Sequence, residues 1–212
     1  MTSTPPPLSS PPLTSTLPLP LPLPLPLPLP LPRIAVRPEP ARPPARVAEI
    51  LVAARDILER EGADALTMRR IGEVLGIRAP SLYKHLASKD ALAAGLAEVA
   101  LAEVGEHLHR AVDEADAGAV AAALIGAYRG YALAHPNLYR MFTAGRLPRA
   151  ALSSGLEQWA GEPFYRATGD PYRAQALWAA THGAVLLELE ERYLPGSDLD
   201  RTYAALAEAF AA

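Results

Sequence analysis

Apolar residues recur every three or four positions through most of the chain after residue 44, and this spacing places them on one face of an α-helix. In the first such segment the apolar positions are Val47, Ile50, Leu51, Ala54, Ile57 and Leu58. Gly62 follows, where a glycine commonly ends a helix. No later stretch alternates for long between apolar and polar residues, as a half-buried strand would. The pattern therefore predicts an all-α protein.

Two short helices are predicted next. Thr67 is a good N-cap for the segment "MRRIGEVL". The side chains expected to face inward from this helix are Met68, Ile71, Val74 and Leu75. Gly76 breaks the chain, and a second helix is expected to begin near Ala79, with Pro80 in its first turn. Two short helices joined by a glycine-containing turn are typical of a helix-turn-helix, although helical hairpins that only pack are also common.

The remaining sequence predicts a series of longer helices. Ser88 is a predicted N-cap, and Asp198 or Asp200 is expected to start the last helix. The predicted helices span residues 90–112, 120–134, 138–142, 156–167 and 171–193, followed by the terminal helix, and residues 143–155 are predicted to form a loop.

Proline sets the first boundary. Seventeen of the 23 prolines lie at or before Pro44, and residues 17–32 are eight consecutive Leu-Pro pairs. A proline at every second position cannot form a membrane-spanning helix, and the basic segment of a secretory signal is missing. We expect residues 17–32 to form polyproline II and residues 1–43 to lie outside the fold. The tail could bind a proline-recognising partner, be dispensable, or reflect a start codon assigned too early.

Charge is distributed unevenly along the chain. Residues 33–89 hold 11 Lys and Arg against 7 Asp and Glu, whereas residues 90–212 hold 9 against 16. A basic segment attached to an acidic one is typical of a DNA-reading module joined to a different domain. Cysteine is absent from the sequence, which excludes disulfides and thiolate metal sites and suits a cytoplasmic location.

The segment "RAPSLYKHLASKDAL", residues 78–92, has the side chains that DNA reading requires. Leu82 and Leu86 are four apart and can anchor a short helix to a core, while no acidic residue occurs between Gly76 and Lys89. Small residues at the start of the helix let its backbone enter a major groove, and Ser, Tyr, Lys and His can reach bases or phosphates. Lys89 follows the predicted cap, where free amides and an ammonium group can hold a phosphate.

The longer segment "GADALTMRRIGEVLGIRAPSLYKHLASKDAL" closely resembles the DNA-binding domain of the tetracycline-repressor (TetR) family, over about residues 46–92. The resemblance implies phosphate contacts for Thr67, Tyr83, His85 and Lys89. It implies base or groove contacts for Arg69, Arg78, Ala79, Ser81 and Lys84. Leu86 stands where the family usually has phenylalanine or valine, which affects fine packing rather than docking.

The C-terminal segments "HPNLYRMF" (135–142) and "LWAATHGAVLLEL" (177–189) resemble, more loosely, the TetR C-terminal class named after its Trp, His and Gly residues, here Trp178, His182 and Gly183. Trp178 and His182 are four apart and share one side of a helix. They are candidate ligand-binding residues that could line an effector pocket. Packing in the core or in a dimer interface is the alternative, and we favour it, because a histidine on an apolar stripe is usually structural.

No pattern in the chain indicates an enzyme. His107 and His109 are two apart on a helix and cannot chelate one metal together, and Ser153 lacks the strand and turn that a serine nucleophile needs. Glu188, Glu190 and Glu191 are interpreted as a solvated face near a helix end. We therefore expect no catalytic residue, no metal and no cofactor.

These observations predict a three-helix helix-turn-helix DNA-binding domain (residues 44–92) followed by a helical ligand-binding and dimerisation bundle (93–212). The function implied by the resemblance is a ligand-responsive transcriptional regulator, expected to be a repressor. The expected partners are double-stranded DNA with a pseudo-palindromic operator, a small-molecule effector and a second copy of the chain, with no membrane. The alternative is a helical protein-interaction module whose hairpin packs and does not read DNA.

The homodimer is expected to form through the last two long helices, at about 171–193 and 198–212, as a four-helix bundle. The stripe expected to make the contact is Ala174, Leu177, Trp178, Thr181, Val185 and Leu189.

Overall fold

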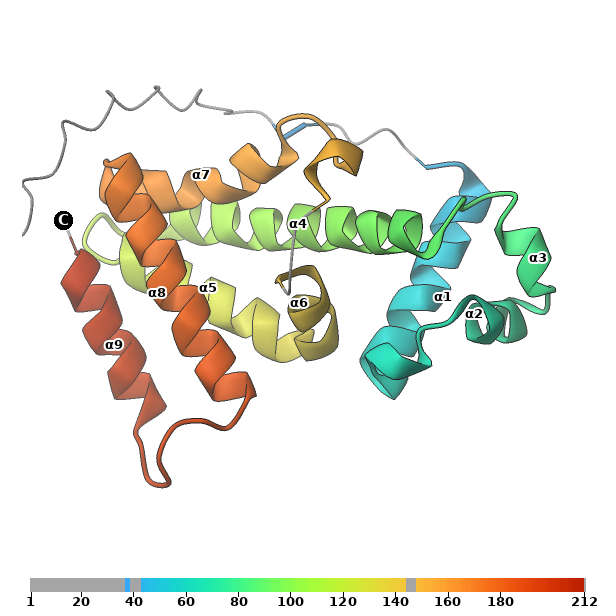
Figure 1. Cartoon of the computed structure of the whole chain (residues 1–212). Coiled ribbons are helices and arrows are strands. Elements are labelled where there is room, and N and C mark those ends of the chain that lie inside the picture. Colours follow the sequence, from blue (N-terminus) through green and yellow to red (C-terminus); the bar gives the residue numbers. More distant parts are fainter. Residues whose placement is uncertain (1–36, 39–42, 144–147, 212) are drawn as a thin grey trace, which may run out of the picture. The chain divides into compact units, whose positions relative to one another are not determined.

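The computed structural model describes residues 37–38, 43–143 and 148–211, and within them every regular element is helical (Figure 1). The polyproline II expectation for residues 17–32 lies outside the described residues. The all-α prediction is confirmed. The helices are α1 (Ala45–Glu61), α2 (Met68–Leu75), α3 (Ala79–Leu82), α4 (Lys89–Glu114), α5 (Val120–Ala134), α6 (Pro136–Thr143), α7 (Leu156–Thr168), α8 (Pro171–Leu189) and α9 (Leu199–Phe210), with single 3-10 turns at Ala63–Ala65 and Arg149–Ala151.

Helices α1, α2 and α3 and the first turns of α4 share one apolar core, and we call this part the head. Each helix contributes a side chain that is almost completely buried: Ile50 and Leu58 from α1, Ile71 from α2, Leu82 from α3 and Leu92 from α4. The amphipathic periodicity in the sequence thus produces a core that fixes α3 against α1 and α2.

Helices α5 and α7 pack against the rest of α4, α8 packs on α5 and α7, and α9 packs on α5 and α8 (Figure 1). We call this part the body. Leu108, Leu124, Leu177 and Val185 form its core. Helices α4 and α7 approach each other closely at Gly105, where an added Cβ would lie 2.4 Å from the ring of Trp159. Only glycine permits this contact, because a larger residue would push α7 away from α4.

Helix α6 belongs to both cores. Leu138 is buried in the core of the head, whereas its neighbour Tyr139 is buried in the core of the body. The carboxylate of Glu59 on α1 accepts hydrogen bonds from the backbone amides of Asn137 and Leu138, at 3.3 and 3.0 Å. These amides are the unpaired donors at the start of α6, so a side chain of the head caps a helix that continues into the body.

A proline inside α7 creates a second cross-link. Pro163 lacks a backbone N–H, so the carbonyl of Trp159, four residues earlier, has no partner within the helix. His109 on α4 supplies the missing donor, because its Nε2 lies 2.9 Å from that carbonyl oxygen. The imidazole also stacks on the Trp159 ring, with centroids 4.6 Å apart. His109 therefore has a structural role.

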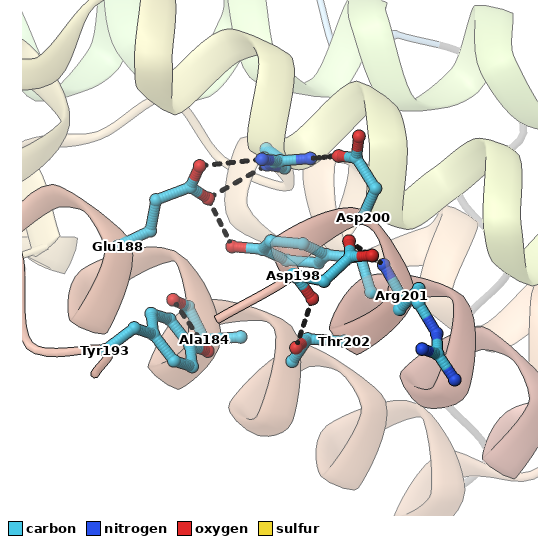
Figure 2. A network of polar contacts seen from close by, with 9 residues as sticks. Ala184, Glu188, Tyr193, Asp198, Asp200, Arg201 and Thr202 are labelled. Carbon is cyan, nitrogen blue, oxygen red and sulfur yellow. Dashed lines mark hydrogen bonds and ion pairs between the residues drawn. The ribbon is translucent and has the colours of Figure 1, made fainter. Parts of the chain in front are cut away.

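A polar network joins α5, α8 and α9. The guanidinium of Arg129 donates to both carboxylate oxygens of Glu188, at 2.9 and 2.7 Å, and to Asp200 at 2.8 Å. Tyr203 also donates to Glu188, and Figure 2 shows Glu188 and Asp200 converging on the same group from α8 and α9. These bonds lower the pKa of Glu188. The interpretation of Glu188 as part of a solvated face was wrong, since its side chain is mostly buried.

Two other expectations from the sequence were also wrong. Val74 was expected to face inward but is 49% exposed, because α2 turns only Met68 and Ile71 fully into the core. Helix α8 ends at Leu189 rather than near Tyr193. The amides of Glu191 and Arg192 bond back to the carbonyls of Glu188 and Leu187, at 3.0 and 2.8 Å, and Glu191 has φ 52°. This is a Schellman ending formed without the usual glycine.

Most of the stripe predicted to make the dimer contact faces the protomer's own core, whereas its Trp178 is 49% exposed. Ala174, Leu177, Thr181 and Val185 are all buried within a single chain, so they cannot meet a second copy. The stripe of α8 that is open in the single chain is a different one, and it includes Tyr172, Ala176, Ala179 and Leu187.

Arg37 contacts the body although it was expected to lie outside the fold. Its guanidinium pairs with Glu106 on α4 at 2.7 Å and lies 5.9 Å from the centre of the Trp159 ring. None of the helices in the described residues has both the length and the apolar character needed to cross a bilayer.

Candidate nucleic-acid interface and cavity

The turn between α2 and α3 is held by backbone contacts. Gly76 has the left-handed conformation (φ 67°) that ends α2, and the amide of Ile77 donates to the carbonyl of Gly72 at 2.9 Å. An added Cβ on Gly72 would lie 2.7 Å from the Ile77 carbonyl oxygen, so only glycine lets the turn pack this closely on α2. The two glycines thus fix the angle at which α3 leaves α2.

Predicted caps hold the segments on both sides of α3. The hydroxyl of Thr67 accepts the amide of Arg70 at 3.1 Å and starts α2. The hydroxyl of Ser88 accepts the amide of Ala91, also at 3.1 Å, and starts α4. Both predictions are confirmed. Because each hydroxyl uses a lone pair in its cap, its hydrogen is still available to an acceptor such as a phosphate.

The predicted DNA-contact residues share an outward position around a short, anchored α3. Leu82 and Leu86 are buried in the head core, as the sequence predicted. The opposite side of this segment is exposed or half-exposed, and so are the predicted positions at the starts of α2 and α4. These positions are Thr67 and Arg69, then Arg78, Ala79, Ser81, Tyr83, Lys84 and His85, and finally Lys89.

The basic side chains of this surface fall into two groups. Arg69 and Arg70 on α2 form ion pairs, with Glu73 at 3.1 Å and Glu61 at 2.8 Å. No comparable pair within the described residues involves Arg78, Lys84 or Lys89. The cations on both sides of α3, Arg78 and Lys84, and Lys89 at the start of α4 are therefore open to an external anion, while Arg69 must exchange its partner before it can contact DNA.

The body contains a partly open cavity of about 690 Å³. Its walls come from α4, α5, α6, α7 and α8, and they are mainly aliphatic and aromatic, as in pockets for small organic molecules. Trp178 and His182 both line it, with their rings stacked at a centroid distance of 5.9 Å. Trp178 is 49% exposed, so it does not pack in the core, whereas His182 is half-buried.

A chain of hydrogen bonds, which we call the relay, leads from the cavity wall into the body core and back. The hydroxyls of Tyr128 and Tyr139 are 3.2 Å apart, and the Tyr139 hydroxyl is 2.6 Å from Nδ1 of His182. Burial raises the pKa of both tyrosines and lowers the pKa of His182. At neutral pH the relay therefore holds two protonated phenols and a neutral imidazole.

The sequence patterns did not identify the relay. Tyr128 and Tyr139 come from α5 and α6, and their partner His182 on α8 is 54 and 43 residues away from them. No local spacing connects the three residues. An excess of tyrosine over phenylalanine (8 against 3) was the one available signal that buried hydroxyls need partners.

Two family models match the chain. Residues 50–107 match "Bacterial regulatory proteins, tetR family", and residues 121–210 match "Tetracyclin repressor-like, C-terminal domain". The first match covers most of the head and the start of the body. The Trp-His-Gly class inferred for the C-terminal part is not confirmed by the second match and stays a prediction.

Known proteins with similar sequences or folds agree with these matches. An uncharacterized HTH-type transcriptional regulator of Mycobacterium tuberculosis is 32% identical over 161 residues, which are 70% of this chain and 73% of the relative. A Rhodococcus sp. RHA1 protein of unknown function superposes with a TM-score of 0.65 at 26% identity, covering 81% of this chain and 96% of that one. A TetR variant from Acinetobacter baumannii in complex with minocycline shares the fold (TM-score 0.55, 24% identity, 76% and 93% covered).

The matches assign a role to both parts of the molecule. A helix-turn-helix whose α3 is anchored to the core and flanked by Arg78 and Lys84 fits the DNA-binding domain of these regulators, and the helical body fits their C-terminal domain. This chain belongs to the TetR family of bacterial regulatory proteins, and it is a DNA-binding transcriptional regulator rather than an enzyme.

Proposed function

We propose that the protein is a homodimeric repressor that binds a pseudo-palindromic operator and is released from it by a small molecule held in the cavity of the body. One α3 reads only a few base pairs, so two copies related by a twofold axis are needed to read a palindrome. The observation that carries the proposal is the open, basic surface around α3, built on buried Leu82 and Leu86.

The proposal assigns two kinds of contact to this surface. Thr67, Tyr83, His85 and Lys89 are assigned to phosphates, which position the head on the duplex without reading sequence. Base or groove contacts are assigned to a second set. This set consists of Arg69, Arg78, Ala79, Ser81 and Lys84. Ala79 lets the backbone of α3 approach the groove, and Ser81, further along the helix, can hydrogen bond a base edge.

We assign different binding functions to the head and to the body. Residues 44–92 would bind DNA, and residues 93–212 would bind the effector and the second protomer. The open stripe of α8 supports a dimer through α8 and α9, since an apolar helix face of this kind is normally covered. Tyr172, Ala176, Ala179 and Leu187 lie on α8, and α9 has two exposed small residues, Ala205 and Ala209.

Control by an effector is supported by α4, which starts in the head at its Ser88 cap and contributes Leu101, Val104 and Leu108 to the cavity wall. An effector that binds better to a conformer in which α4 has moved would change the separation of the two heads. Affinity for DNA would then fall by the ratio of the effector's affinities for the two conformers. The TetR variant that holds minocycline supports a small-molecule effector for this fold.

Selection of bound fragments from genomic DNA tests the proposal. The wild-type protein is expected to enrich fragments that share an inverted repeat, and electrophoretic mobility shifts should then give one dimer per site. A helical interaction module, the alternative function, would enrich no sequence. Because the proposed partner is chromosomal DNA, the proposal also places the protein in the cytoplasm.

A further inference from the structure

The relay has one hydrogen more than it can use internally. It contains two hydroxyl hydrogens and one imidazole hydrogen, and its three polar atoms lie within hydrogen-bonding distance of one another: the two hydroxyls at 3.2 Å, and Nδ1 of His182 at 2.6 Å from Tyr139 and 3.4 Å from Tyr128. At most two of these three contacts can be hydrogen bonds at the same time, because Nδ1 either donates or accepts but cannot do both. If the bonds run from Tyr128 toward His182, the hydrogen left over is on Nε2 of the imidazole. If they run the other way, it is on the Tyr128 hydroxyl. In both cases one donor is spare.

The spare donor belongs to a cavity-lining residue in either case. Tyr128 and His182 both line the cavity, whereas Tyr139, the middle member, is completely buried. No buried polar side-chain atom of the described residues lacks a hydrogen-bond partner. The spare donor therefore lies on a residue of the cavity wall, which is mainly apolar and includes Phe142 and Phe164.

The charges of the cavity wall disfavour an anion. Arg149 is paired with Glu157 through two bonds of 2.7 Å, so this pair is neutral as a whole. Glu162 is the remaining acidic side chain of the wall, and its nearest potential cation is Nδ1 of His109 at 3.7 Å. The charged side chains that line the cavity are thus one arginine and two glutamates, so the wall has one more negative charge than positive charge.

We infer that the effector is an uncharged, largely apolar molecule that carries a hydrogen-bond acceptor such as a carbonyl oxygen, and that this acceptor binds the free end of the relay. The inference rests on the proposed function, because it takes the cavity to be the effector site. A volume of about 690 Å³ accommodates a molecule of several fused or linked rings, and Trp178 offers such rings an aromatic face.

Three naphthalene probes of similar shape test the inference by equilibrium dialysis against the full chain. They are 2-acetylnaphthalene, which has a neutral acceptor, 2-ethylnaphthalene, which has none, and 2-naphthoate, which is an anion. The quantity to compare is the ratio of the dissociation constants of 2-ethylnaphthalene and 2-acetylnaphthalene. The two probes differ in hydrophobicity, but this difference affects the ratio equally in every protein variant. A change in the ratio between two variants therefore reports the acceptor contact alone.

The decisive variant replaces the whole relay by phenylalanine: Tyr128→Phe, Tyr139→Phe and His182→Phe. Removing all polar partners together leaves no unpaired buried group and keeps ring volumes similar, so the fold should survive. The ratio is expected to fall about three- to tenfold, which corresponds to the loss of one hydrogen bond. The matched control is Gln175→Leu, which removes another polar side chain of the same wall and should leave the ratio unchanged.

Three results would overturn the inference: an unchanged ratio in the relay variant, a ratio that falls in Gln175→Leu instead, or 2-naphthoate binding more tightly than 2-acetylnaphthalene to the wild type. Failure of all three probes to bind would overturn it too. The proposed function would fail differently. If the ketone is preferred but neither it nor any ketone of greater size affects operator binding, the ligand class stands and the cavity is not the control site.

Discussion

At the scale of single residues, the proposed docking separates contacts that position the head on DNA from contacts that read bases. Lys89 stands at the start of α4 with an unneutralised ammonium group, whereas Ser81 is half-exposed on α3. Lys89→Ala should therefore weaken binding similarly for operator and random DNA. It should also reduce the slope of log affinity against log salt by about one for each phosphate that is no longer neutralised. Titrations at several salt concentrations measure both effects.

The comparison variants are Arg78→Ala and Ser81→Ala. Removing a good hydrogen bond to a base should change which bases are preferred at a cost of about 1–3 kcal/mol, with little change in the salt slope for Ser81. The docking proposed here would be wrong if Lys89→Ala changed base preference while both of these variants left it unaltered.

His182 predicts a specific pH dependence. Burial lowers its pKa below the ordinary 6.5, so the unfolded chain binds a proton at His182 at a pH where the folded protein does not. The stability that this residue contributes is present above pH 6.5 and is lost as the pH falls below it. Chemical denaturation at pH 7.5 and 5.5 measures how much free energy of unfolding is lost between the two pH values. This loss should be smaller in His182→Gln than in the wild type, because glutamine can still accept from Tyr139 but does not titrate. Equal losses would contradict the prediction.

At the scale of elements, α7 depends on a donor from α4. His109→Phe keeps an aromatic ring against Trp159 but removes the N–H that satisfies the Trp159 carbonyl. We expect a loss of about 1–2 kcal/mol in the free energy of unfolding, because a buried carbonyl is left unpaired. In a Pro163→Ala background the amide of residue 163 can donate to the Trp159 carbonyl, so His109→Phe should then lower the free energy of unfolding by less. A double-mutant cycle measured by urea denaturation gives this difference. If the effects of the two substitutions simply add, His109 does not replace the donor that Pro163 lacks.

Most element boundaries could be predicted because their signals are local. Thr67, Ser88 and Asp198 start their helices through hydrogen bonds to amides three residues later, and Gly76 ends α2 in a conformation that favours glycine. The end of α8 could not be predicted in this way. Glu191 adopts the left-handed conformation although it is not a glycine, so nothing in the local sequence marked the position.

The DNA-contact surface and the relay also differed in whether a local sequence signal could identify them. The residues proposed to contact DNA lie within 23 positions of one another, from Thr67 to Lys89, so a local motif identified them. Three-dimensional packing alone brings Tyr128, Tyr139 and His182 together. The dimer stripe was misjudged for a related reason: helical periodicity identifies an apolar face, but it does not say whether that face meets its own chain or another one.

At the scale of the whole molecule, the open stripe of α8 predicts which substitutions break the dimer. Ala179→Arg places a charge in the middle of this stripe and should weaken dimerisation by more than about tenfold, because a buried guanidinium without a partner is strongly disfavoured. Ala122→Arg is the matched control, since Ala122 is an exposed alanine on α5. Sedimentation velocity at micromolar concentration should give monomers for the first variant and dimers for the second. The opposite pattern would place the interface elsewhere.

The N-terminal tail gives the other prediction at this scale. Deleting residues 1–36 should leave the free energy of unfolding and the affinity for DNA nearly unchanged, since α1 begins only at Ala45. Extending the deletion through Arg37 removes its ion pair with Glu106, which is largely exposed and should contribute at most about 1 kcal/mol. Thermal and DNA titrations of the two truncated proteins check this. A large fall in melting temperature after the first deletion would show that the tail takes part in the fold.

The double membership of α6 limits how such a regulator can be recombined with others. A chimera that takes residues 44–92 from a different regulator would keep Leu138 but replace the surface into which it packs. It would also lose the carboxylate of Glu59, leaving the first amides of α6 without their acceptor. The exchangeable unit is therefore not a continuous stretch of sequence. A working hybrid must carry α6, or at least a matched pair at positions 59 and 138, together with the DNA-binding segment.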